Sequence, residues 1–384
     1  MKQDNRLKFR HIIATAGFCL FLLVGFLLHL ATPDLAFSET EKRALEAFTP
    51  PLPAQLASGR FMSSFERYAN DQFPFRPFFV GLKSESERLI GKFDNGRVWF
   101  GRDGYLFEKK TEMPDLTYHA EFLRGFASVL EEKYPEMRRF LMIAPTATEI
   151  VPDRLPPLTP AIPQTETLIS WFDDAGDYTV VDVASRLQDG NRDDYFYRND
   201  HHWTSAGALA GYRAFANAAG FTADESVKPV TLVDRFLGTT YAKAAVFFPK
   251  PDTLSIYRTD GDDPNDRVRI YDGTGTLLQT GLYDYEKLLS SDPYLVFIGR
   301  NDDYLRLETD AAGNKSLLLI KDSYANSMLP FLTKDYKTIH VIDLRYFGSS
   351  LSALIQKEGP IDDTLILYNF VTFSEDTNLY RLLR

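Results

Sequence analysis

The sequence predicts an α/β fold with a mostly parallel central sheet. Short, continuous apolar runs recur between stretches of helical periodicity, which is typical of strands that helices cover on both faces. The runs lie at 140–143, 180–183, 295–298, 317–320, 339–342 and 365–368. Between about residues 225 and 290 the pattern changes to alternating strands with turns rich in Gly and Asp, which predicts a β-rich insertion. The 384 residues, 44% of them hydrophobic, suffice for a large core.

An apolar segment near the N-terminus has the length that a bilayer requires. It runs from Ile12 to Ala31. The basic residues before it are Lys2, Arg6, Lys8 and Arg10. About 20 apolar residues span the hydrocarbon core, and basic residues on the N-terminal side favour a cytoplasmic N-terminus. We therefore expect residues 1–31 to form a cytoplasmic stub and a single transmembrane anchor in the cell membrane, with the remaining residues outside. A cleaved signal peptide is the alternative, although its apolar region is usually only about 7 to 15 residues long.

Composition divides the rest of the chain. Residues 32–60 are rich in Pro, Glu and Thr, which predicts a juxtamembrane linker, and residues 61–384 are expected to form one domain with residues 225–290 as its insertion. The single cysteine, Cys19, lies in the apolar segment, so a disulfide framework and a Cys-based metal site are excluded from the predicted domain. The net charge of -10 argues against nucleic acid as a partner, because phosphate backbones are attracted to basic surfaces.

The densest polar cluster is the segment Asp200-His201-His202-Trp203, just before a helical stretch. A carboxylate two residues before a histidine can bond the imidazole and fix its tautomer, as an acid orients a base in nucleophilic hydrolases. The competing interpretation is that a nearby Thr or Ser caps the helix and the histidines only fill polar surface. If the first interpretation holds, the spacing favours His202 as the base and Asp200 as its orienting acid.

A second cluster follows the apolar run at 317–320. There Ser323 stands between a predicted buried strand and a helix, a position that lifts a hydroxyl out of the carboxyl edge of a sheet. A helix-capping serine is again the alternative. A third element, Gly299 with Asn301, comes directly after the run at 295–298, where a side-chain amide can donate to an oxyanion; an ordinary Gly/Asn turn explains it equally well.

The segment Asp200-His201-His202-Trp203 resembles the defining motif of the DHHW protein family. Other segments resemble that family's recurring segments, namely 37–39, 71–76, 101–106, 321–326 and 343–346. The family is similar to the SGNH-hydrolase-like domains of the alginate acetylation proteins AlgJ and AlgX. This resemblance implies a three-layer SGNH-hydrolase-like fold in which the Asp-x-His pair precedes the serine.

The resemblance also implies roles for individual residues. It makes Ser323 the nucleophile, His202 the base and Asp200 the orienting acid. Gly299 and Asn301 become candidates for the oxyanion hole, since they resemble the block that supplies an oxyanion-hole Asn. The remaining residues of these motifs that we expect near the site are His201, Trp203 and Asn326. The chain departs from SGNH enzymes at Lys321, where those enzymes usually have Gly before Asp-Ser.

These observations predict a serine esterase or O-acetyltransferase that needs no cofactor or metal and acts on acetyl groups of cell-envelope or exopolysaccharide carbohydrate. Its expected partners are a carbohydrate polymer or acetyl ester and a membrane-bound acyl donor. One alternative is a metal-dependent phosphoesterase, in which the Asp-His-His cluster would need further ligands from His119 or His340. The other is a non-catalytic protein that binds polysaccharide on an inactive scaffold, because a fold alone does not establish an activity.

Overall fold

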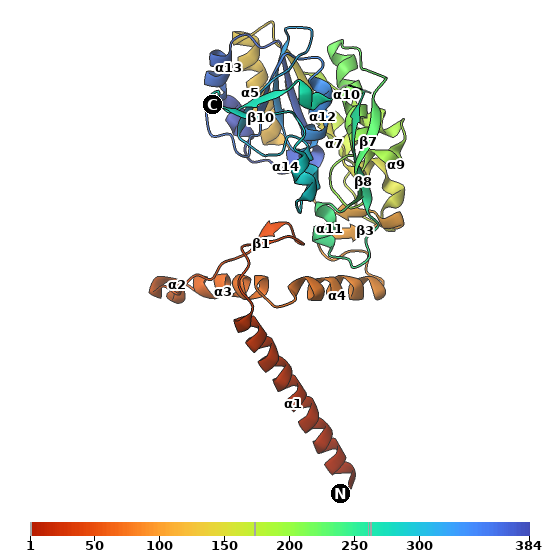
Figure 1. The fold of residues 1–384 in the computed structure, drawn as a ribbon, viewed down its shortest axis with the longest axis vertical. Helices are drawn as coiled ribbons and strands as arrows, with labels where there is room; N and C mark the ends of the chain where they lie inside the picture. Colours follow the sequence, from red (N-terminus) through yellow and green to blue (C-terminus); the bar gives the residue numbers. More distant parts are fainter. Residues whose placement is uncertain (1, 173, 260, 262) are drawn as a thin grey trace. The chain divides into compact units, whose positions relative to one another are not determined.

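The computed structural model describes residues 2–172, 174–259, 261 and 263–384, and side chains from residue 9 onward, so the side chains of Lys2, Arg6 and Lys8 lie outside the described residues. The chain divides into two compact units, which can be followed in Figure 1. The membrane-proximal unit comprises residues 1–90 and 245–247. The sheet unit comprises residues 91–244 and 248–384.

The membrane-proximal unit is mainly helical. Its elements are α1 (Lys2–Ala31), β1 (Phe37–Ser38), β2 (Arg43–Ala44), α2 (Pro53–Ala57), α3 (Arg60–Asp71) and α4 (Arg76–Leu89). Within α1, the segment Phe9–Ala31 is long and apolar enough to cross a membrane, and none of it is buried by the rest of the chain. Residues 32–60, which the composition assigned to a linker, contain the β1–β2 pair and α2.

The sheet unit contains the predicted α/β core. Its sheet has eight strands in the order β10-β9-β11-β13-β12-β14-β5-β6. These strands are β5 (Arg138–Ala144), β6 (Thr179–Val180), β9 (Arg269–Tyr271), β10 (Leu277–Thr280), β11 (Tyr304–Glu308), β12 (Ser316–Lys321), β13 (Thr338–Ile342) and β14 (Asp363–Asn369). The strands from β13 to β6 run parallel, and β11, β9 and β10 continue the sheet antiparallel.

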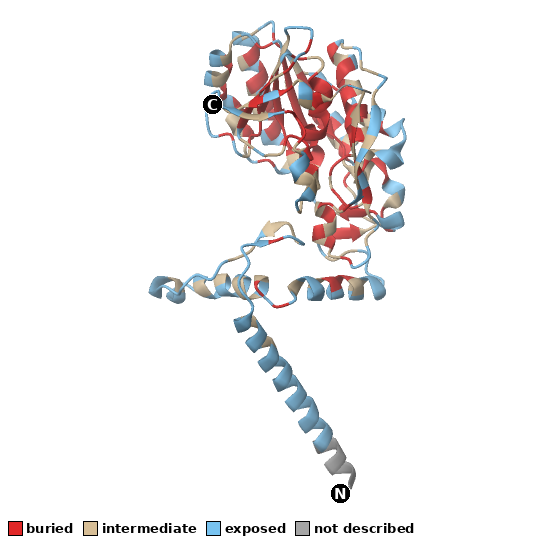
Figure 2. Cartoon of the chain, in the orientation of Figure 1, coloured by how far each residue is buried: buried red, intermediate tan, exposed pale blue. Residues whose placement is uncertain are grey.

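Helices cover both faces of this sheet, so the unit has three layers. Along β12, Leu317 and Leu319 point into one hydrophobic cluster, and Leu318 and Ile320 point into another, because successive side chains of a strand alternate between faces. The first cluster includes residues of α8 (Val183–Gln188), α10 (Ser205–Ala219) and α12 (Tyr324–Leu332). The second includes residues of α5 (Thr117–Lys133), α7 (Gln164–Phe172), α13 (Leu351–Glu358) and α14 (Phe370–Glu375). Figure 2 shows the buried core concentrated in the sheet and its adjoining helices.

The sheet unit also contains several shorter elements. Its remaining elements are β3 (Val98–Phe100), β4 (Leu106–Glu108), β7 (Lys228–Phe236), β8 (Asp252–Arg258), α6 (Ala147–Ile150), α9 (Arg192–Tyr195), α11 (Thr239–Ala244), η1 (Arg102–Gly104), η2 (Pro152–Arg154), η3 (Pro264–Asp266), η4 (Tyr285–Leu289), η5 (Pro293–Val296) and η6 (Leu379–Leu383). Strands β7 and β8 form an antiparallel hairpin inside the segment expected to be an insertion, whereas β9 and β10 of the same segment extend the central sheet.

Two expected strands differ from the structure. The run at 295–298 belongs largely to η5 and the turn after it, so the predicted strand there is wrong. Val296 and Phe297 of this run pack with Tyr197 and Phe236 in a separate cluster, whereas Ile298 packs in the first core cluster and Leu295 is only partly buried. The run at 180–183 forms only the two-residue edge strand β6 before α8 begins at Val183.

Candidate active site

Ser323 lies where a central strand is followed by a helix. Strand β12 ends at Lys321, and Ser323 is the N-terminal cap of α12. Its neighbours Asp322 and Tyr324 are buried, whereas Ser323 is partly exposed. The serine therefore lies at the carboxyl edge of a parallel sheet, where a substrate can reach it, which is the usual place for a ligand in open α/β sheets.

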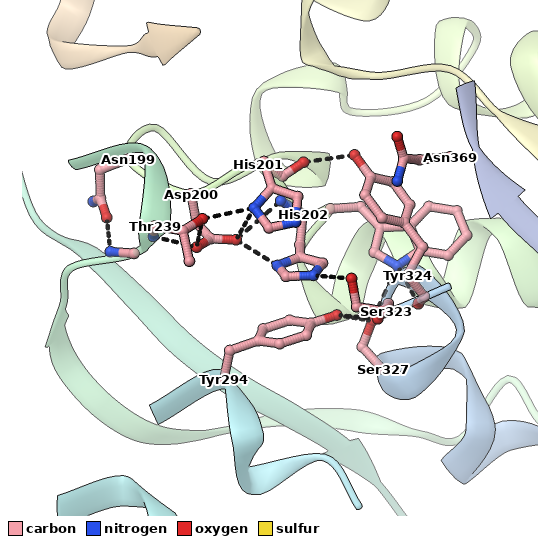
Figure 3. A network of polar contacts seen from close by, with 12 residues as sticks. Asn199, Asp200, His201, His202, Thr239, Tyr294, Ser323, Tyr324, Ser327 and Asn369 are labelled. Atoms are coloured by element: carbon pink, nitrogen blue, oxygen red, sulfur yellow. Dashed lines mark hydrogen bonds and ion pairs between the residues drawn. The ribbon is translucent and has the colours of Figure 1, made fainter. Parts of the chain in front are cut away.

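His202 reaches this serine from a segment that is distant in the sequence. It belongs to the motif loop, residues 200–203, which precedes α10 and its capping residue Thr204. Nε2 of His202 lies 2.8 Å from Oγ of Ser323 (Figure 3), although the two residues are 121 positions apart. The structure thus brings together the serine and the histidine that the sequence analysis had paired.

Asp200 bonds the other nitrogen of the same imidazole. Its Oδ1 accepts hydrogen bonds from Nδ1 of His202 at 2.5 Å and from the backbone N–H of His202 at 2.9 Å. Its Oδ2 accepts from the backbone N–H of Thr239 at 2.7 Å and from the Thr239 hydroxyl at 3.0 Å. Gly238 lies so close that a Cβ atom there would come within 2.2 Å of the carboxylate. Four donors and a glycine therefore fix the position of this acid.

Aromatic side chains hold the imidazole and the serine turn together. The ring of Tyr294 stacks on His202 with a centroid separation of 3.8 Å and an interplanar angle of 9°. The Tyr294 hydroxyl lies 3.1 Å from Oγ of Ser327 and 3.2 Å from the carbonyl oxygen of Ser323. From the motif loop, Nε1 of Trp203 donates to the carbonyl oxygen of Tyr324 and to Oγ of Ser327, both at 3.0 Å. Figure 3 shows Tyr294, Tyr324 and Ser327 close to Ser323 and His202.

The electrostatics favour a neutral histidine beside an ionised acid. Burial and the nearby His201 together lower the pKa of His202 to about 4, against the opposing effect of the Asp200 carboxylate. Burial alone would raise the pKa of Asp200, but the two imidazoles and the hydrogen bonds outweigh burial and keep that pKa well below its usual value. Because an ionised carboxylate only accepts hydrogen bonds, Nδ1 of His202 carries the proton and Nε2 presents a lone pair to Ser323.

The segment that contains Asp200 and His202 also lies within a match to a known protein family. The profile of the DHHW protein family matches residues 137–342, more than half of the chain. The chain belongs to the DHHW family. The resemblance expected from the sequence is thereby confirmed. Among curated protein sequences there is no significant match.

Solved structures support the fold of this DHHW protein. A DHHW family protein from Eubacterium siraeum matches with a TM-score of 0.60 and 23% identity, covering 73% of this chain and 92% of that one. Bacillus cereus PatB1, carrying a sulfonyl adduct, matches with a TM-score of 0.60 and 19% identity, covering 74% and 99%. The O-acetyltransferase domain of Pseudomonas putida AlgJ matches with a TM-score of 0.45 and 15% identity, covering 73% and 92%. The first two matches agree with the predicted three-layer architecture.

A buried polar network supports the serine turn of this DHHW protein. Asp322 accepts hydrogen bonds from the backbone N–H groups of Tyr324 and Asn369, both at 2.9 Å, which links the ends of β12 and β14 to the start of α12. Lys321, at the position where SGNH enzymes usually have Gly, is buried and donates to Oδ1 of Asn326 at 2.8 Å. Burial lowers the pKa of this lysine, although Asp343, whose Oδ2 lies 3.8 Å from Nζ, opposes the shift. Asn326 thus provides a hydrogen-bond acceptor for the buried ammonium group of Lys321.

Gly299 and Asn301, the candidates for the oxyanion hole, take no part in the hydrogen bonds that join Ser323, His202 and Asp200. The backbone N–H of Gly299 donates to the carbonyl oxygen of Leu295 at 2.8 Å, and Asn301 is exposed. Among the contacts of the described residues, none joins either residue to Ser323. Their assignment to an oxyanion hole remains a prediction from the sequence.

His201 has a different environment from His202. Its Nδ1 lies 2.6 Å from the hydroxyl of Thr239, and it lines a cavity of about 540 Å³, open volume at the mouth included, together with Asp200. Ligand atoms of Asp200, His201 and His202 lie within 4.8 Å of one another, as a metal site would require. However, both nitrogens of His202 already bond Asp200 and Ser323. The additional ligands that the phosphoesterase alternative needs are engaged elsewhere, because His119 bonds the carbonyl oxygen of Phe373 and His340 bonds the hydroxyl of Tyr304.

Four residues that shape this site were not predicted from the sequence. Thr239 and Gly238 position Asp200, Tyr294 stacks on His202, and Asn369 holds Asp322. Asn369 had a usable signal, because it directly follows the apolar run at 365–368 and so stands at the carboxyl end of a predicted strand. The other three lie in segments without a recognisable motif, and only the folded chain brings them to the triad.

Proposed function

We propose that this protein is a serine esterase or O-acetyltransferase with Ser323 as nucleophile, His202 as general base and Asp200 as orienting acid. The observation that carries the proposal is the continuous chain of hydrogen bonds from Oγ of Ser323 through both nitrogens of His202 to the carboxylate of Asp200. A merely structural N-cap serine does not need a buried neutral imidazole on its hydroxyl. Nucleophile, base and orienting group within hydrogen-bond distance are the geometric signature of nucleophilic catalysis.

The proposed reaction proceeds in two halves. His202 Nε2 accepts the proton of the Ser323 hydroxyl while Oγ attacks the carbonyl carbon of an acetyl ester. The tetrahedral intermediate then collapses, the leaving alkoxide takes the proton from His202, and an acetyl-serine remains. In the second half, water or a sugar hydroxyl gives its proton to Nε2 and attacks the acetyl group, and the serine leaves with that proton. Water gives hydrolysis, and a sugar hydroxyl gives O-acetyl transfer.

The oxyanion of the intermediate needs hydrogen-bond donors. The backbone N–H of Ser323, for which the described residues provide no acceptor, is the candidate nearest to the reacting carbon. Its neighbour Tyr324 is committed, because the backbone N–H of Tyr324 donates to Oδ1 of Asp322. A donor on the backbone of the nucleophile itself lies close to the oxyanion that forms when Oγ attacks. One such donor contributes roughly 10²-fold to 10³-fold to turnover in serine enzymes.

The resemblance of the motifs to alginate acetylation proteins directs the proposal to acetyl groups on cell-envelope or exopolysaccharide carbohydrate. We also infer that α1 anchors the protein in the membrane with the sheet unit outside the cytoplasm, where such polymers are found. This inference rests on the apolar segment Phe9–Ala31 and on the basic residues that precede it in the sequence. A membrane-bound acyl donor would then lie in the same membrane as this protein, which would accept the acyl group from it.

The proposal is tested with the full chain purified in detergent. We expect turnover of an aryl acetate by the unmodified protein and none above background by the Ser323→Ala variant. PatB1 carries a sulfonyl adduct, and sulfonyl fluorides modify activated serines, so the same class of reagent should add one sulfonyl group to this chain, at Ser323. Adding a carbohydrate alcohol and following its acetylation then separates transfer from hydrolysis. A protein with neither turnover nor a sulfonyl adduct would be the non-catalytic polysaccharide-binding protein instead.

A further inference from the structure

Helix α3 of the membrane-proximal unit is amphipathic and leaves its apolar side uncovered. Residues that share one side of the helix at 3.6 residues per turn are Phe61, Met62, Phe65 and Tyr68. The side chains of Met62 and Phe65 are 61% and 41% exposed, and α3 has no buried residue. The opposite side carries polar and charged residues such as Glu66, Arg67 and Asn70. Figure 2 shows α3 largely in the exposed colour.

Helix α4 repeats this pattern. Phe75, Phe79, Leu82 and Leu89 lie along one side and are 68%, 41%, 45% and 87% exposed. The packing of α4 within its own unit uses another side, where a Cβ on Gly81 would meet the ring of Phe247. The apolar side of α4 therefore remains uncovered although the helix has a packing partner. Together, these sides form the apolar platform, defined here as Met62, Phe65, Phe75, Phe79, Leu82 and Leu89.

The end of α1 is fastened to α3 by short contacts. Helix α1 ends at Ala31, and three residues later Oδ1 of Asp34 accepts a hydrogen bond from the hydroxyl of Tyr68 at 3.1 Å. The side chain of Gln72 then bonds both the backbone N–H and the carbonyl oxygen of Leu35, at 3.0 and 2.9 Å. Three extended residues span about 10 Å at most, so the C-terminal half of α3 is held that close to the end of α1.

The apolar side of α3 faces the end of α1. The ring of Tyr68 lies 5.9 Å from the ring of His29, in the last turn of α1. Along α3, ring contacts continue from Tyr68 to Phe65 at 6.2 Å and from Phe65 to Phe61 at 5.9 Å. The apolar stripe of α3 is therefore continuous with the apolar segment of α1.

We propose that the apolar platform lies in the interfacial layer of the lipid bilayer, on the side where α1 ends. The inference rests on α1 spanning the membrane. An amphipathic helix enters the interface by about 5 to 10 Å, and the headgroup layers extend only a few ångströms beyond the hydrocarbon core. The C-terminal half of α3, fastened within about 10 Å of the end of a spanning helix, falls in that layer, and α4, which begins at Arg76, continues the platform from there. Exposed apolar area of this kind is stable there, whereas in water it would favour association.

The charges on α3 and α4 indicate which lipids the platform needs. The two helices carry nearly equal numbers of opposite charges, with five basic residues (Arg60, Arg67, Arg76, Lys83 and Arg88) and four acidic residues (Glu66, Asp71, Glu85 and Glu87). Helices that depend on anionic lipid carry a clear excess of Lys and Arg on the polar face. The platform is therefore expected to bind through apolar burial and to insert into neutral phosphatidylcholine as well as into anionic membranes.

The test uses the full chain in phosphatidylcholine vesicles, with a fluorescent label on single cysteines and lipids brominated at shallow or deep positions as quenchers. Cys19 is the only cysteine and reports on the anchor itself. In a Cys19→Ser background, Phe65→Cys and Leu82→Cys report on the platform. Arg67→Cys and Arg88→Cys are the matched controls on other sides of α3 and α4.

We expect the Cys19 label to be quenched by deep bromines, and the labels at 65 and 82 by shallow bromines with emission shifted to the blue. Labels at 67 and 88 should keep most of their fluorescence. Quenching at 65 and 82 no stronger than at 67 and 88, with Cys19 still quenched, would overturn the platform and leave the anchor intact. An unquenched label at Cys19 would instead overturn the anchor, and the platform with it. Neither result depends on esterase activity.

Discussion

The imidazole of His202 is surrounded by groups that each restrict it. Asp200 bonds one nitrogen, Ser323 the other, and the ring of Tyr294 stacks on its face. A bare Asp-x-His spacing predicts the first of these contacts and nothing about the third. The candidate triad was therefore predictable from the motif, while the side chains that hold it rigid were not, because Tyr294 comes from a segment whose sequence gives no sign of its neighbours.

The two adjacent histidines should respond differently to substitution. We expect His202→Ala to lower turnover of an activated acetyl ester by about 10⁴-fold or more, because it removes the base. His201→Ala should keep substantial activity, since His201 bonds Thr239 and has no described contact with Ser323. Steady-state kinetics and circular dichroism of both variants provide the measurement. Equal losses that manganese or zinc restores and a chelator abolishes would favour the phosphoesterase alternative.

The pH dependence should report the burial of His202. Protonation of Nε2 removes the lone pair that accepts the serine proton, so kcat/KM should rise with pH through about 4 and be level near neutrality. The ordinary pKa of about 6.5 applies to the unfolded chain, which therefore binds more protons between about pH 4 and 6.5. His202 thus contributes stability that is present above this window and is lost as the pH falls through it. An acidic limb near 6.5 would show that the base is solvated.

Gly238 should tolerate no side chain. In Gly238→Ala the new Cβ would collide with Asp200, so the acid must move and the tautomer of His202 is no longer fixed. We expect turnover to fall by an amount approaching the roughly 10⁴-fold effect of disabling a triad acid, with a stability loss of about 1–3 kcal/mol. Gly348→Ala, where nothing lies within 4 Å of the added atom, is the matched control. Unchanged kinetics of Gly238→Ala would contradict the role given to Asp200.

Among the elements, the sequence predicted best those with continuous apolar runs followed by a helix. Strand β12 and helix α12 around Ser323 were expected and are present. The run at 295–298 has the same composition but starts within η5 and forms only an isolated bridge between Phe297 and Tyr283, while Val296 and Phe297 fill a cluster beside Phe236. A short apolar run identifies burial, and only the available partners decide between strand and helix.

The contact between the motif loop and α12 can be tested with Trp203→Phe. The ring volume is largely kept, but the N–H that bonds Tyr324 and Ser327 is lost. Ser327 keeps the Tyr294 hydroxyl as a donor, so the variant mainly loses buried hydrogen bonds worth about 0.5–1.5 kcal/mol each, and the denaturant midpoint should fall with an unchanged slope. We also expect kcat to fall more than KM rises, because the start of α12 positions the nucleophile. A variant as stable and as active as the unmodified protein would show that this contact is dispensable.

For the whole molecule, the sequence predicted the long apolar N-terminal helix and the α/β core, but not the division into two units. Residues 245–247 belong to the membrane-proximal unit although they lie in the middle of the sheet unit's sequence. Nothing in the composition of that tripeptide marks it, since its assignment follows from Phe247 packing against Gly81. Similarly, β9 and β10 join the central sheet from a segment that resembles an independent hairpin region.

The proposed topology gives a direct experiment. If α1 spans the membrane with its basic flank in the cytoplasm, protease added to intact cells or spheroplasts should digest residues 33–384. The fragment pattern can be followed with an antibody against the C-terminus. A cytoplasmic protein of the same cells must remain intact as a control for lysis. Full protection of the domain until the cells are broken would contradict the topology.

The order of the strands along the sequence also determines when, during synthesis of the chain, the candidate site can form. Strand β5 pairs with β14, the last strand of the chain, so this pairing joins an early and a late part of the sheet unit's sequence. Asp200 and His202 are synthesised well before Ser323, and Ser323 is fastened through Asp322 to Asn369 at the end of β14. Pairings between such distant segments form slowly and late. If α1 spans the membrane as proposed, a nascent chain that is still crossing it contains Asp200 and His202 without Ser323 in place, and the proposed site is completed only after β14 has reached the far side.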